Sequence, residues 1–211
     1  MDREYWNTFY SQTHKDIQGP SSFAVHIQDA LKAGQTLFEL GCGNGRDSVY
    51  FASRGVAVTA CDQSEVSISE LQKRGEGAPF AWPTFICASF DGIDGAYDSS
   101  FDAVYSRFTL HAVTKEVGTQ ALMWASKGLR QGGHLFIEAR SIAGSLYGQG
   151  EARERDAFIH DGHYRRFIRR DELEAEVVAL GFEIVSSVES DGLSVYKTDD
   201  PVLIRIKARK T

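Results

Sequence analysis

The sequence predicts a doubly wound α/β fold, built on a mostly parallel seven-stranded sheet with an antiparallel last strand. Three observations predict it. Apolar runs of strand length alternate with helix-length amphipathic segments along most of the 211 residues. A glycine-rich stretch, FELGCGNGRDSVYF, joins the first apolar run to the first helical pattern. Two apolar runs separated by a short loop close the chain, which is typical of an antiparallel hairpin.

Each element follows from a local pattern. Strands are predicted where β-branched and apolar residues run together, and helices where apolar residues recur at helical spacing and a glycine follows. The predicted strands are Thr36–Leu40, Val56–Cys61, Thr84–Ala88, Phe101–Ser106, His134–Ala139, Phe182–Val188 and Val202–Ala208. The predicted helices are Arg46–Arg54, Glu65–Arg74 with Ser64 as its N-cap, Thr114–Arg130 closed by Gly132 and Gly133, and Arg170–Leu180.

The chain is predicted to be one domain, residues 1–211, because it has no internal repeat and no low-complexity linker. An aromatic helix is expected within about residues 1–30, where Trp6 and Phe9 favour core packing. About residues 140–170 are expected to form a lid and acceptor segment. The small, turn-forming residues of EARSIAGSLYGQG indicate a mobile loop there, and HYRRFI is expected to be extended.

Composition limits the function. A net charge of −6 argues against a general nucleic-acid footprint, which needs a basic face. No window approaches the roughly 18 apolar residues of a membrane span, and the N-terminus lacks the pattern of a secretory signal. We therefore expect a cytoplasmic monomer or homodimer. The three cysteines have no zinc-like spacing, so no metal site is predicted.

The glycines of the first loop indicate a nucleoside cofactor. Gly41, Gly43 and Gly45 lie between a strand and a helix, and Asp62 follows about 20 residues later, placed to bind a ribose. A dinucleotide site has the spacing G-x-G-x-x-G, whereas Arg46 stands here where the third glycine would be needed. Glu39 would repel a pyrophosphate but suits an ammonium group. S-adenosylmethionine carries an ammonium group and no phosphate.

Several segments resemble one family. ELGCGNGR followed by ACDQS resembles motif I and the acid after it in class I S-adenosylmethionine-dependent methyltransferases. FDAVYSRFTLHAV is similar to the fourth-strand motif of that family, and LRQGGHLFIEAR to its glycine turn and fifth strand. The run GCGNGRDSVYFASRGVAVTACDQS is similar to the tellurite-resistance and thiopurine-type branch. The resemblance covers about residues 36–139 and, more loosely, ELEAEVVALGFEI.

The resemblance implies a set of cofactor residues around S-adenosylmethionine, whose product is S-adenosylhomocysteine. Glu39, Gly41, Cys42 and Gly43 would hold the methionine end, Asp62 the ribose, and Gln63 the adenine. Ser106 and Arg107 would lie beside the sulfonium. The remaining members are Arg46 after the glycine loop, Tyr10 on the N-terminal helix, and Ser89, which stands near the position where many relatives have an adenine-binding Asp.

The acceptor residues are expected after the fourth strand and in the His/Arg-rich segment. His111 and Arg107 follow the fourth strand, and His163, Arg165 and Arg166 lie in HYRRFI. Arginine holds phosphate and carboxylate groups in bidentate fashion. Two alternatives remain open. His111 could be a hydrogen-bonded structural histidine, and the arginines could be paired with acids at Glu151, Glu154, Asp156 and Asp161.

The sequence therefore predicts a methyltransferase for a small molecule, acting on oxygen in an acceptor with a phosphate, phosphonate or carboxylate group. The alternative enzyme is an S- or chalcogen-directed methyltransferase. Two further classes are a nicotinamide-dependent oxidoreductase, against which Arg46 and Glu39 argue, and a non-catalytic cofactor-binding partner. The segment SRFTLH lacks the N/D-P-P-Y/F pattern of base-modifying relatives, which argues against nucleic-acid methylation.

Overall fold

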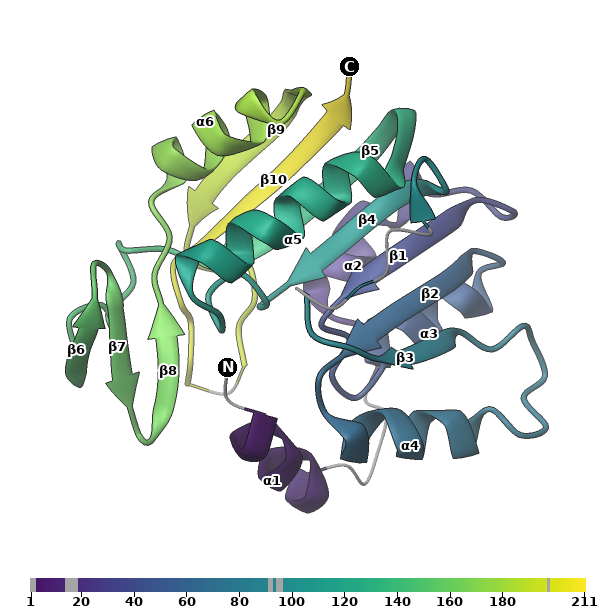
Figure 1. The fold of residues 1–211 in the computed structure, drawn as a ribbon, viewed down its shortest axis with the longest axis horizontal. Coiled ribbons are helices and arrows are strands. Elements are labelled where there is room, and N and C mark those ends of the chain that lie inside the picture. Colours follow the sequence, from purple (N-terminus) through teal and green to yellow (C-terminus); the bar gives the residue numbers. More distant parts are fainter. Residues whose placement is uncertain (1–2, 14–18, 91–92, 94–96, 197) are drawn as a thin grey trace.

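A seven-stranded sheet forms the centre of the molecule in the computed structural model, which describes residues 3–13, 19–90, 93, 97–196 and 198–211 (Figure 1). Its order is β3-β2-β1-β4-β5-β10-β9. The strands are β1 (Thr36–Leu40), β2 (Ala57–Asp62), β3 (Thr84–Cys87), β4 (Phe101–Arg107), β5 (Leu129–Arg140), β9 (Phe182–Ser190) and β10 (Leu203–Lys210). Neighbouring strands are parallel except β10, which is antiparallel to β5 and β9. The predicted fold class is confirmed.

Helices flank both faces of this sheet (Figure 1). Several begin at a side chain that caps a free backbone N–H group, as Ser64 does for Ser67 and Thr114 for Val117. The helices are α1 (Arg3–Thr13), α2 (Ser22–Ile27), the short 3₁₀ helix η1 (Gln28–Ala30), α3 (Arg46–Ser53), α4 (Glu65–Arg74), α5 (Lys115–Gly128) and α6 (Arg170–Ala179).

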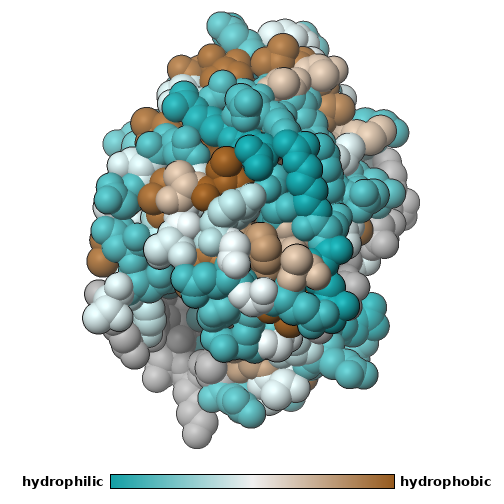
Figure 2. Space-filling view, turned by 90° about the vertical axis from the view of Figure 1, so that its left-hand side faces the viewer, coloured by the Kyte–Doolittle hydropathy of each residue, from teal (hydrophilic) through white to brown (hydrophobic). Residues whose placement is uncertain are grey.

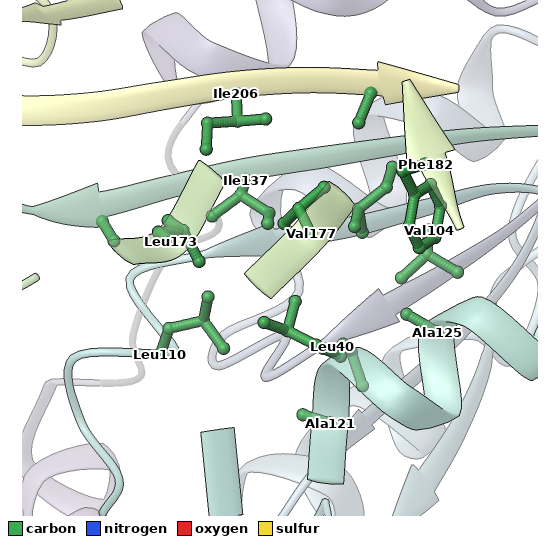
Figure 3. Packing of buried hydrophobic residues seen from close by; sticks show 14 of the residues in the cluster. Leu40, Val104, Leu110, Ala121, Ala125, Ile137, Leu173, Val177, Phe182 and Ile206 are labelled. Atoms are coloured by element: carbon green, nitrogen blue, oxygen red, sulfur yellow. The ribbon is translucent and has the colours of Figure 1, made fainter. Parts of the chain in front are cut away.

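Alternate residues of the strands face opposite layers, so the sheet has a core on each side. On one side α5 and α6 pack onto the sheet, as Figure 3 shows for Leu40, Val104, Ala121, Ala125, Ile137, Leu173, Val177 and Ile206. On the other side, α2, α3 and α4 contribute Phe23, Phe51, Ile68 and Leu71 against Leu37, Val58, Tyr105 and Phe136. The central strands β1 and β4 are therefore buried on both faces, and only their ends are left to carry polar chemistry.

A second, three-stranded antiparallel sheet was not predicted. It consists of β6 (Glu151–Glu154), β7 (Ala157–His160) and β8 (His163–Arg166). The extended conformation expected for HYRRFI is confirmed over His163–Arg166, whereas β6 and β7 lie in a part of the lid and acceptor segment for which no strand was predicted. The exposed, polar β6 has no apolar alternation to predict it. The dipeptide Asp161-Gly162 was an available sequence signal, because Asp-Gly is typical of two-residue hairpin turns. In the structure both residues have positive φ values, and they form the turn that joins β7 to β8.

The predicted boundary between α5 and β5 was wrong. The helix expected to reach Arg130 ends at Gly128, and β5 already begins at Leu129. Leu129 is buried and pairs with Phe101, so its side chain belongs to the core of the sheet. Gly132, with φ of +76°, lies where the register shifts before β5 continues beside β4.

The surface that carries the small sheet is largely hydrophilic. Figure 2 shows this side, with hydrophobic residues scattered in small groups and no single broad apolar patch. No helix among the described residues has the length and apolar character needed to cross a membrane.

Candidate functional site

A cavity of about 670 Å³ lies at the carboxyl ends of β1, β2 and β4. Its walls come from the glycine loop after β1, the residues after β2 and β3, the β4–α5 loop, α1 and the β9–β10 loop. Parallel α/β sheets bind their ligands at this edge, and the volume is that of a site for a cofactor-sized molecule.

The glycine loop is pressed closely by side chains of the protein itself. Gly41 and Gly43 have φ values of +72° and +53°, which side chains rarely allow. A Cβ on Gly41 would lie 2.1 Å from Thr109 Cγ2, and one on Gly43 would lie 2.4 Å from the Tyr10 hydroxyl oxygen. The loop backbone therefore lines the cavity between the β4–α5 loop and α1.

Asp62 holds the glycine loop to α4. One carboxylate oxygen accepts the Gly43 N–H at 2.9 Å, and the other accepts the Ser64 N–H at 2.9 Å. Ser64 in turn caps α4 by accepting the Ser67 N–H at 3.2 Å. Asp62 lines the cavity at the end of β2, where the sequence placed a ribose-binding acid.

Glu39 is a buried acid in the cavity wall. It is only 3% exposed and accepts a hydrogen bond from the Ser48 hydroxyl. Burial raises the pKa of the Glu39 carboxyl well above its usual range, and Asp47 raises it further, while the Ser48 hydrogen bond and Arg107 oppose the rise. A buried carboxylate in this setting is stabilised by a cation, so this end of the cavity suits a positively charged ligand.

Asp47 is a second buried acid, which the sequence analysis missed. It accepts hydrogen bonds from the Ser21 N–H and hydroxyl, both at 2.7 Å, and from the Tyr105 hydroxyl at 2.8 Å. Arg46 Nε lies 3.7 Å from the same carboxylate, and both residues line the cavity. Asp47 thus joins α2, α3 and β4 beneath the site. No local sequence pattern could have predicted this role, because its partners Ser21 and Tyr105 lie far from it in the chain.

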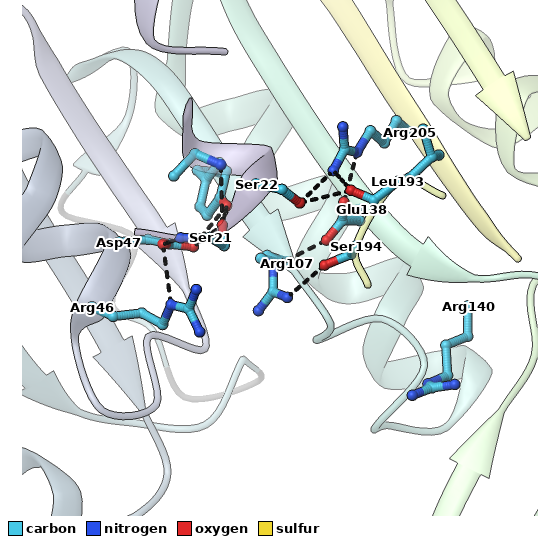
Figure 4. Close-up of polar contacts among 12 residues, drawn as sticks. Ser21, Ser22, Arg46, Asp47, Arg107, Glu138, Arg140, Leu193, Ser194 and Arg205 are labelled. Atoms are coloured by element: carbon cyan, nitrogen blue, oxygen red, sulfur yellow. Dashed lines mark hydrogen bonds and ion pairs between the residues drawn. The ribbon is translucent and has the colours of Figure 1, made fainter. Parts of the chain in front are cut away.

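Arg107 enters the cavity wall from the end of β4 (Figure 4). Its Nε donates to Glu138 Oε1 at 3.0 Å, and its Nη2 donates to the Ser194 hydroxyl at 3.2 Å. Burial raises the pKa of Glu138, while Arg107 and Arg205 oppose that rise. Ser194 belongs to the β9–β10 loop, so this arginine connects the central sheet to a loop nearly 90 residues away in the sequence.

Phe108 follows Arg107 with a backbone conformation that is rare for a large side chain. Its φ is +59°, and its N–H donates to the Glu138 carbonyl at 2.9 Å. The Arg107 guanidinium lies 4.1 Å from the ring centroid and that of Arg140 5.7 Å. Phe108 lines the cavity, so the strained residue presents an aromatic surface to a ligand.

His111 lies outside the cavity lining. Its Nδ1 accepts the Arg140 N–H at 3.3 Å, and its carbonyl accepts the Arg166 N–H at 2.8 Å. Burial lowers the pKa of His111 well below its usual range, and the nearby cations, first Arg140, lower it further. The ring is therefore neutral, and its contacts match the alternative of a hydrogen-bonded structural histidine.

The His/Arg-rich segment also lies outside the cavity lining. The ring of His163 stacks on Tyr5 with centroids 4.4 Å apart, so β8 supports α1. Arg166 donates to the carbonyls of Leu110 and Val113 at 2.7 and 3.1 Å. These hydrogen bonds hold the β4–α5 loop in place. They also engage the Arg166 guanidinium with main-chain acceptors.

We expect Arg166→Met to lower the free energy of unfolding by about 2–3 kcal/mol, because two main-chain carbonyls lose a charged donor. Urea denaturation measures this loss. Arg165→Met is the matched control, since the side chain of Arg165 has no hydrogen bond or ion pair with any described residue. It should stay within about 0.5 kcal/mol of the parent protein. Equal losses in both variants would contradict the support role of Arg166.

The structure brings most of the predicted cofactor residues together. Lining the cavity are Tyr10, Glu39, Gly41, Cys42, Gly43, Arg46, Asp62, Gln63, Ser89 and Arg107. Ser106 is buried beside the lining, where its hydroxyl is hydrogen-bonded to that of Thr109. Of the predicted acceptor residues, only Arg107 reaches the cavity; His111, His163, Arg165 and Arg166 do not.

Other lining residues were missed or given another role. Trp6 and Phe9 were expected in the core, but both line the cavity and Phe9 is 41% exposed. The β9–β10 loop contributes Ser194, Val195, Tyr196, Asp199 and Pro201. The apolar LSVY in an otherwise polar loop was an available signal. Among the residues that the structure describes, no group of three potential ligands is arranged for a metal ion.

Comparisons with known proteins agree with this geometry. Residues 38–137 match the family model described as a methyltransferase domain. A cypemycin N-terminal methyltransferase from a Streptomyces species is 30% identical over 122 residues, which are 57% of this chain and 48% of that protein. The match therefore spans about half the length of that curated relative.

Solved structures resemble the whole chain. An S-adenosylmethionine-dependent methyltransferase from Methanosarcina mazei has a TM-score of 0.76 at 18% identity, covering 88% of this chain and 96% of that one. A 1,6-didemethyltoxoflavin-N1-methyltransferase from Burkholderia thailandensis, solved with 1,6-didemethyltoxoflavin and S-adenosylhomocysteine, has a TM-score of 0.72 at 19% identity, covering 99% and 87%. At identities of 18% and 19%, the similarity to these structures shows only that the fold is shared.

The fold is thus the Rossmann-like methyltransferase fold, with its cavity at the expected edge. The family-model match and the relatives together support an S-adenosylmethionine-dependent methyltransferase, with S-adenosylmethionine as its cofactor. The narrower resemblance to the tellurite-resistance and thiopurine-type branch stays a prediction, because the comparisons support the class alone.

Proposed function

We propose that this chain transfers the methyl group of S-adenosylmethionine to a small molecule that carries an anionic group. One observation carries the proposal. A single cavity is lined by the buried acids Glu39 and Asp47 beside the glycine loop and, from the neighbouring strand β4, by Arg107 with the aromatic residue Phe108. A cationic cofactor and an anionic acceptor fit this pair of opposite charges in one cavity.

The residues at the acidic end fit S-adenosylmethionine. The cofactor supplies an electrophilic methyl group on a sulfonium and also carries an ammonium and a carboxylate group. Glu39 would pair with the ammonium group and Arg46 with the carboxylate. Asp62 would accept the ribose hydroxyls, while Gln63 and Ser89 would flank the adenine. Gly41 and Gly43 line the cavity, and because they have no Cβ, Thr109 and Tyr10 can pack directly against the loop backbone.

The aromatic residues of the lining support an aromatic or otherwise planar acceptor. Phe108, Trp6 and Tyr196 line the cavity together with Arg107. An oxygen that is already ionised, as in a carboxylate or phosphate, needs positioning and charge balance but no base. These features support oxygen as the methylated atom. A soft nucleophile, a thiolate or chalcogen oxyanion, remains the alternative because it is also anionic.

The other classes receive less support. The buried Glu39 beside the glycine loop opposes a pyrophosphate, so a nicotinamide cofactor fits less well. A non-catalytic cofactor-binding partner would have no use for an aromatic and cationic acceptor wall. The cytoplasmic location and the choice between monomer and homodimer remain predictions from the sequence.

The proposal is tested by S-adenosylhomocysteine release across a panel of acceptors. Carboxylates, phosphates and phosphonates are compared with thiols, phenols and amines; amines belong in the panel because two relatives are named for an N-terminus and an N1 position. We expect turnover confined to the anionic oxygen acceptors. Turnover with thiols alone would favour the soft-nucleophile alternative, and turnover with amines alone would overturn the acceptor assignment. Calorimetry with S-adenosylhomocysteine and NAD separates the cofactor classes.

A further inference from the structure

Three charged side chains connect the cavity to the outer part of the sheet. Arg107 Nε donates to Glu138 Oε1 at 3.0 Å, and Arg205 Nε donates to Glu138 Oε2 at 2.6 Å. The Glu138 side chain is fully buried, and those of Arg107 and Arg205 are only 18% and 10% exposed. Two guanidinium groups share one carboxylate, so this triad carries a net charge of +1.

The triad is also fixed to the loop that covers the cavity. Arg205 Nη2 donates to the Leu193 carbonyl at 2.6 Å and to the Ser22 hydroxyl at 3.0 Å. The Ser22 hydroxyl donates to the same carbonyl at 2.7 Å. Figure 4 shows these contacts on one side of Glu138 and Arg107 on the other. The β9–β10 loop and α2 therefore hold Arg205 in place behind Glu138.

Arg107 keeps donor capacity toward the cavity. Its Nε and Nη2 make the bonds to Glu138 and Ser194, and none of the described residues accepts a bond from its Nη1. The guanidinium lies over the Phe108 ring, 4.1 Å from its centroid. The Nη1 N–H groups, with the second N–H of Nη2, form an edge of the guanidinium that can hold a carboxylate in bidentate geometry.

We propose that the triad of Arg107, Glu138 and Arg205 is a carboxylate-binding subsite for a planar methyl acceptor, and that Arg205 is its positioning residue. The inference rests on the proposed function and names the acceptor class of the same site. Arg107 contacts the carboxylate, Phe108 contacts the planar body, and Glu138 holds Arg107. Arg205 lies outside the cavity lining and acts through Glu138, because it balances the carboxylate that would otherwise neutralise Arg107.

A carboxylate could also come from the methionine part of the cofactor. We assign that group to Arg46, which follows the glycine loop and lines the same cavity. Arg107 lies beside Phe108 and the β9–β10 loop, but its strand also neighbours β1 and its charge lowers the pKa of Glu39, so position alone does not separate the two sources. The experiment therefore has separate arms for the two sources.

The test uses the full chain loaded with S-adenosylhomocysteine, benzoate as the carboxylate probe and benzamide as its neutral counterpart. Arg205→Gln should weaken benzoate binding about 10-fold, because Glu138 is then balanced by Arg107 alone, and should leave benzamide binding unchanged. Glu138→Gln should maintain or strengthen benzoate binding, because it leaves two cations and keeps an acceptor oxygen. Arg209→Gln is the control, since Arg209 lies on the same strand in an exposed pair with Glu183.

Weaker benzoate binding in Arg205→Gln, together with unchanged or tighter binding in Glu138→Gln, would support the triad, and thermal unfolding verifies that each variant folds. Equal weakening of benzoate and benzamide would assign Arg205 a purely structural role and overturn the proposal. So would failure of the parent protein to bind benzoate. Loss of S-adenosylhomocysteine affinity with unchanged methylthioadenosine affinity would assign the subsite to the cofactor carboxylate instead.

These measurements separate the inference from the proposed function. Benzoate binding needs no methyl transfer, so absence of turnover with every acceptor would reject the proposed function without altering the binding result. If S-adenosylhomocysteine does not bind, the proposed cofactor fails and the benzoate series is measured on the ligand-free chain.

Discussion

Glu39→Gln should abolish most of the affinity for S-adenosylmethionine while making the ligand-free protein more stable. The variant keeps an oxygen that accepts the Ser48 hydroxyl but loses the negative charge that would pair with the ammonium group. Loss of a charge-assisted contact of about 1.5–3 kcal/mol corresponds to roughly 10- to 100-fold weaker binding. Titration calorimetry measures the affinity, and urea denaturation measures the stability.

The gain in stability follows from the sign of the pKa shift. Folding raises the pKa of Glu39, chiefly by burial and by Asp47, so the folded state binds this proton more tightly than the unfolded state. Between the unfolded and folded pKa values, stability therefore falls as pH rises, and the loss is complete above the folded pKa. Removing the acid should therefore raise the free energy of unfolding at neutral pH.

The same carboxyl group predicts how cofactor affinity depends on pH. Affinity should decrease as pH falls through the pKa of Glu39, because the protonated acid no longer attracts the ammonium group. In Glu39→Gln this decrease should disappear. Ser48→Ala is the control, since it removes the hydrogen bond but keeps the charge. A variant with unchanged affinity and an unchanged pH profile would remove Glu39 from the proposed cofactor site.

Gly41→Ala should destabilise the fold by about 3 kcal/mol, because it combines left-handed strain of about 1–2 kcal/mol with overpacking of about 1–3 kcal/mol. The new Cβ would lie 2.1 Å from Thr109 Cγ2. Thr109 cannot easily rotate away, because its side chain is β-branched and its hydroxyl is bonded to Ser106. Displacement of the glycine loop should also weaken S-adenosylhomocysteine binding at least about 10-fold.

Two companion variants isolate the steric part of this effect. Gly132 has a similar φ of +76° and nothing within 4 Å of its Cβ position, so Gly132→Ala should show the backbone strain alone. Thr109→Ser removes the clashing methyl group and keeps the hydroxyl, so it should rescue a large part of the loss in a Gly41→Ala background. Additive losses in that double-mutant cycle would contradict the close approach.

Local patterns predicted the cofactor end of the site well. The glycine loop, Glu39 and Asp62 lie within one strand–loop–helix–strand unit, in which a parallel crossover leaves few possible arrangements. Capping at Ser64 and the short apolar run of β1 that ends at glycines were equally local signals. The family resemblance added roles for Gln63, Ser89 and Tyr10, all of which line the cavity.

The acceptor end could not be predicted in the same way. The sequence indicated a cationic segment around Arg165 and Arg166, but the loop carbonyls of Leu110 and Val113 decide where the Arg166 guanidinium lies. A strand of four residues has two faces, and the tertiary neighbour chooses between them. The small sheet thus supports the walls of the cavity from outside. The pattern of charges in the sequence had instead favoured direct binding of the acceptor by these arginines.

By itself, the sequence determined the doubly wound sheet, the glycine loop and the acid that follows it, because each depends on residues close together in the chain. Only the tertiary structure placed Arg107, Glu138 and Arg205 in contact, across separations of 31 and 67 positions. The last strand inserts beside β5, and this antiparallel pairing brings Arg205 to Glu138. Long-range strand order is set by the burial of whole faces, so the side chains that meet at a strand end are decided by the complete fold.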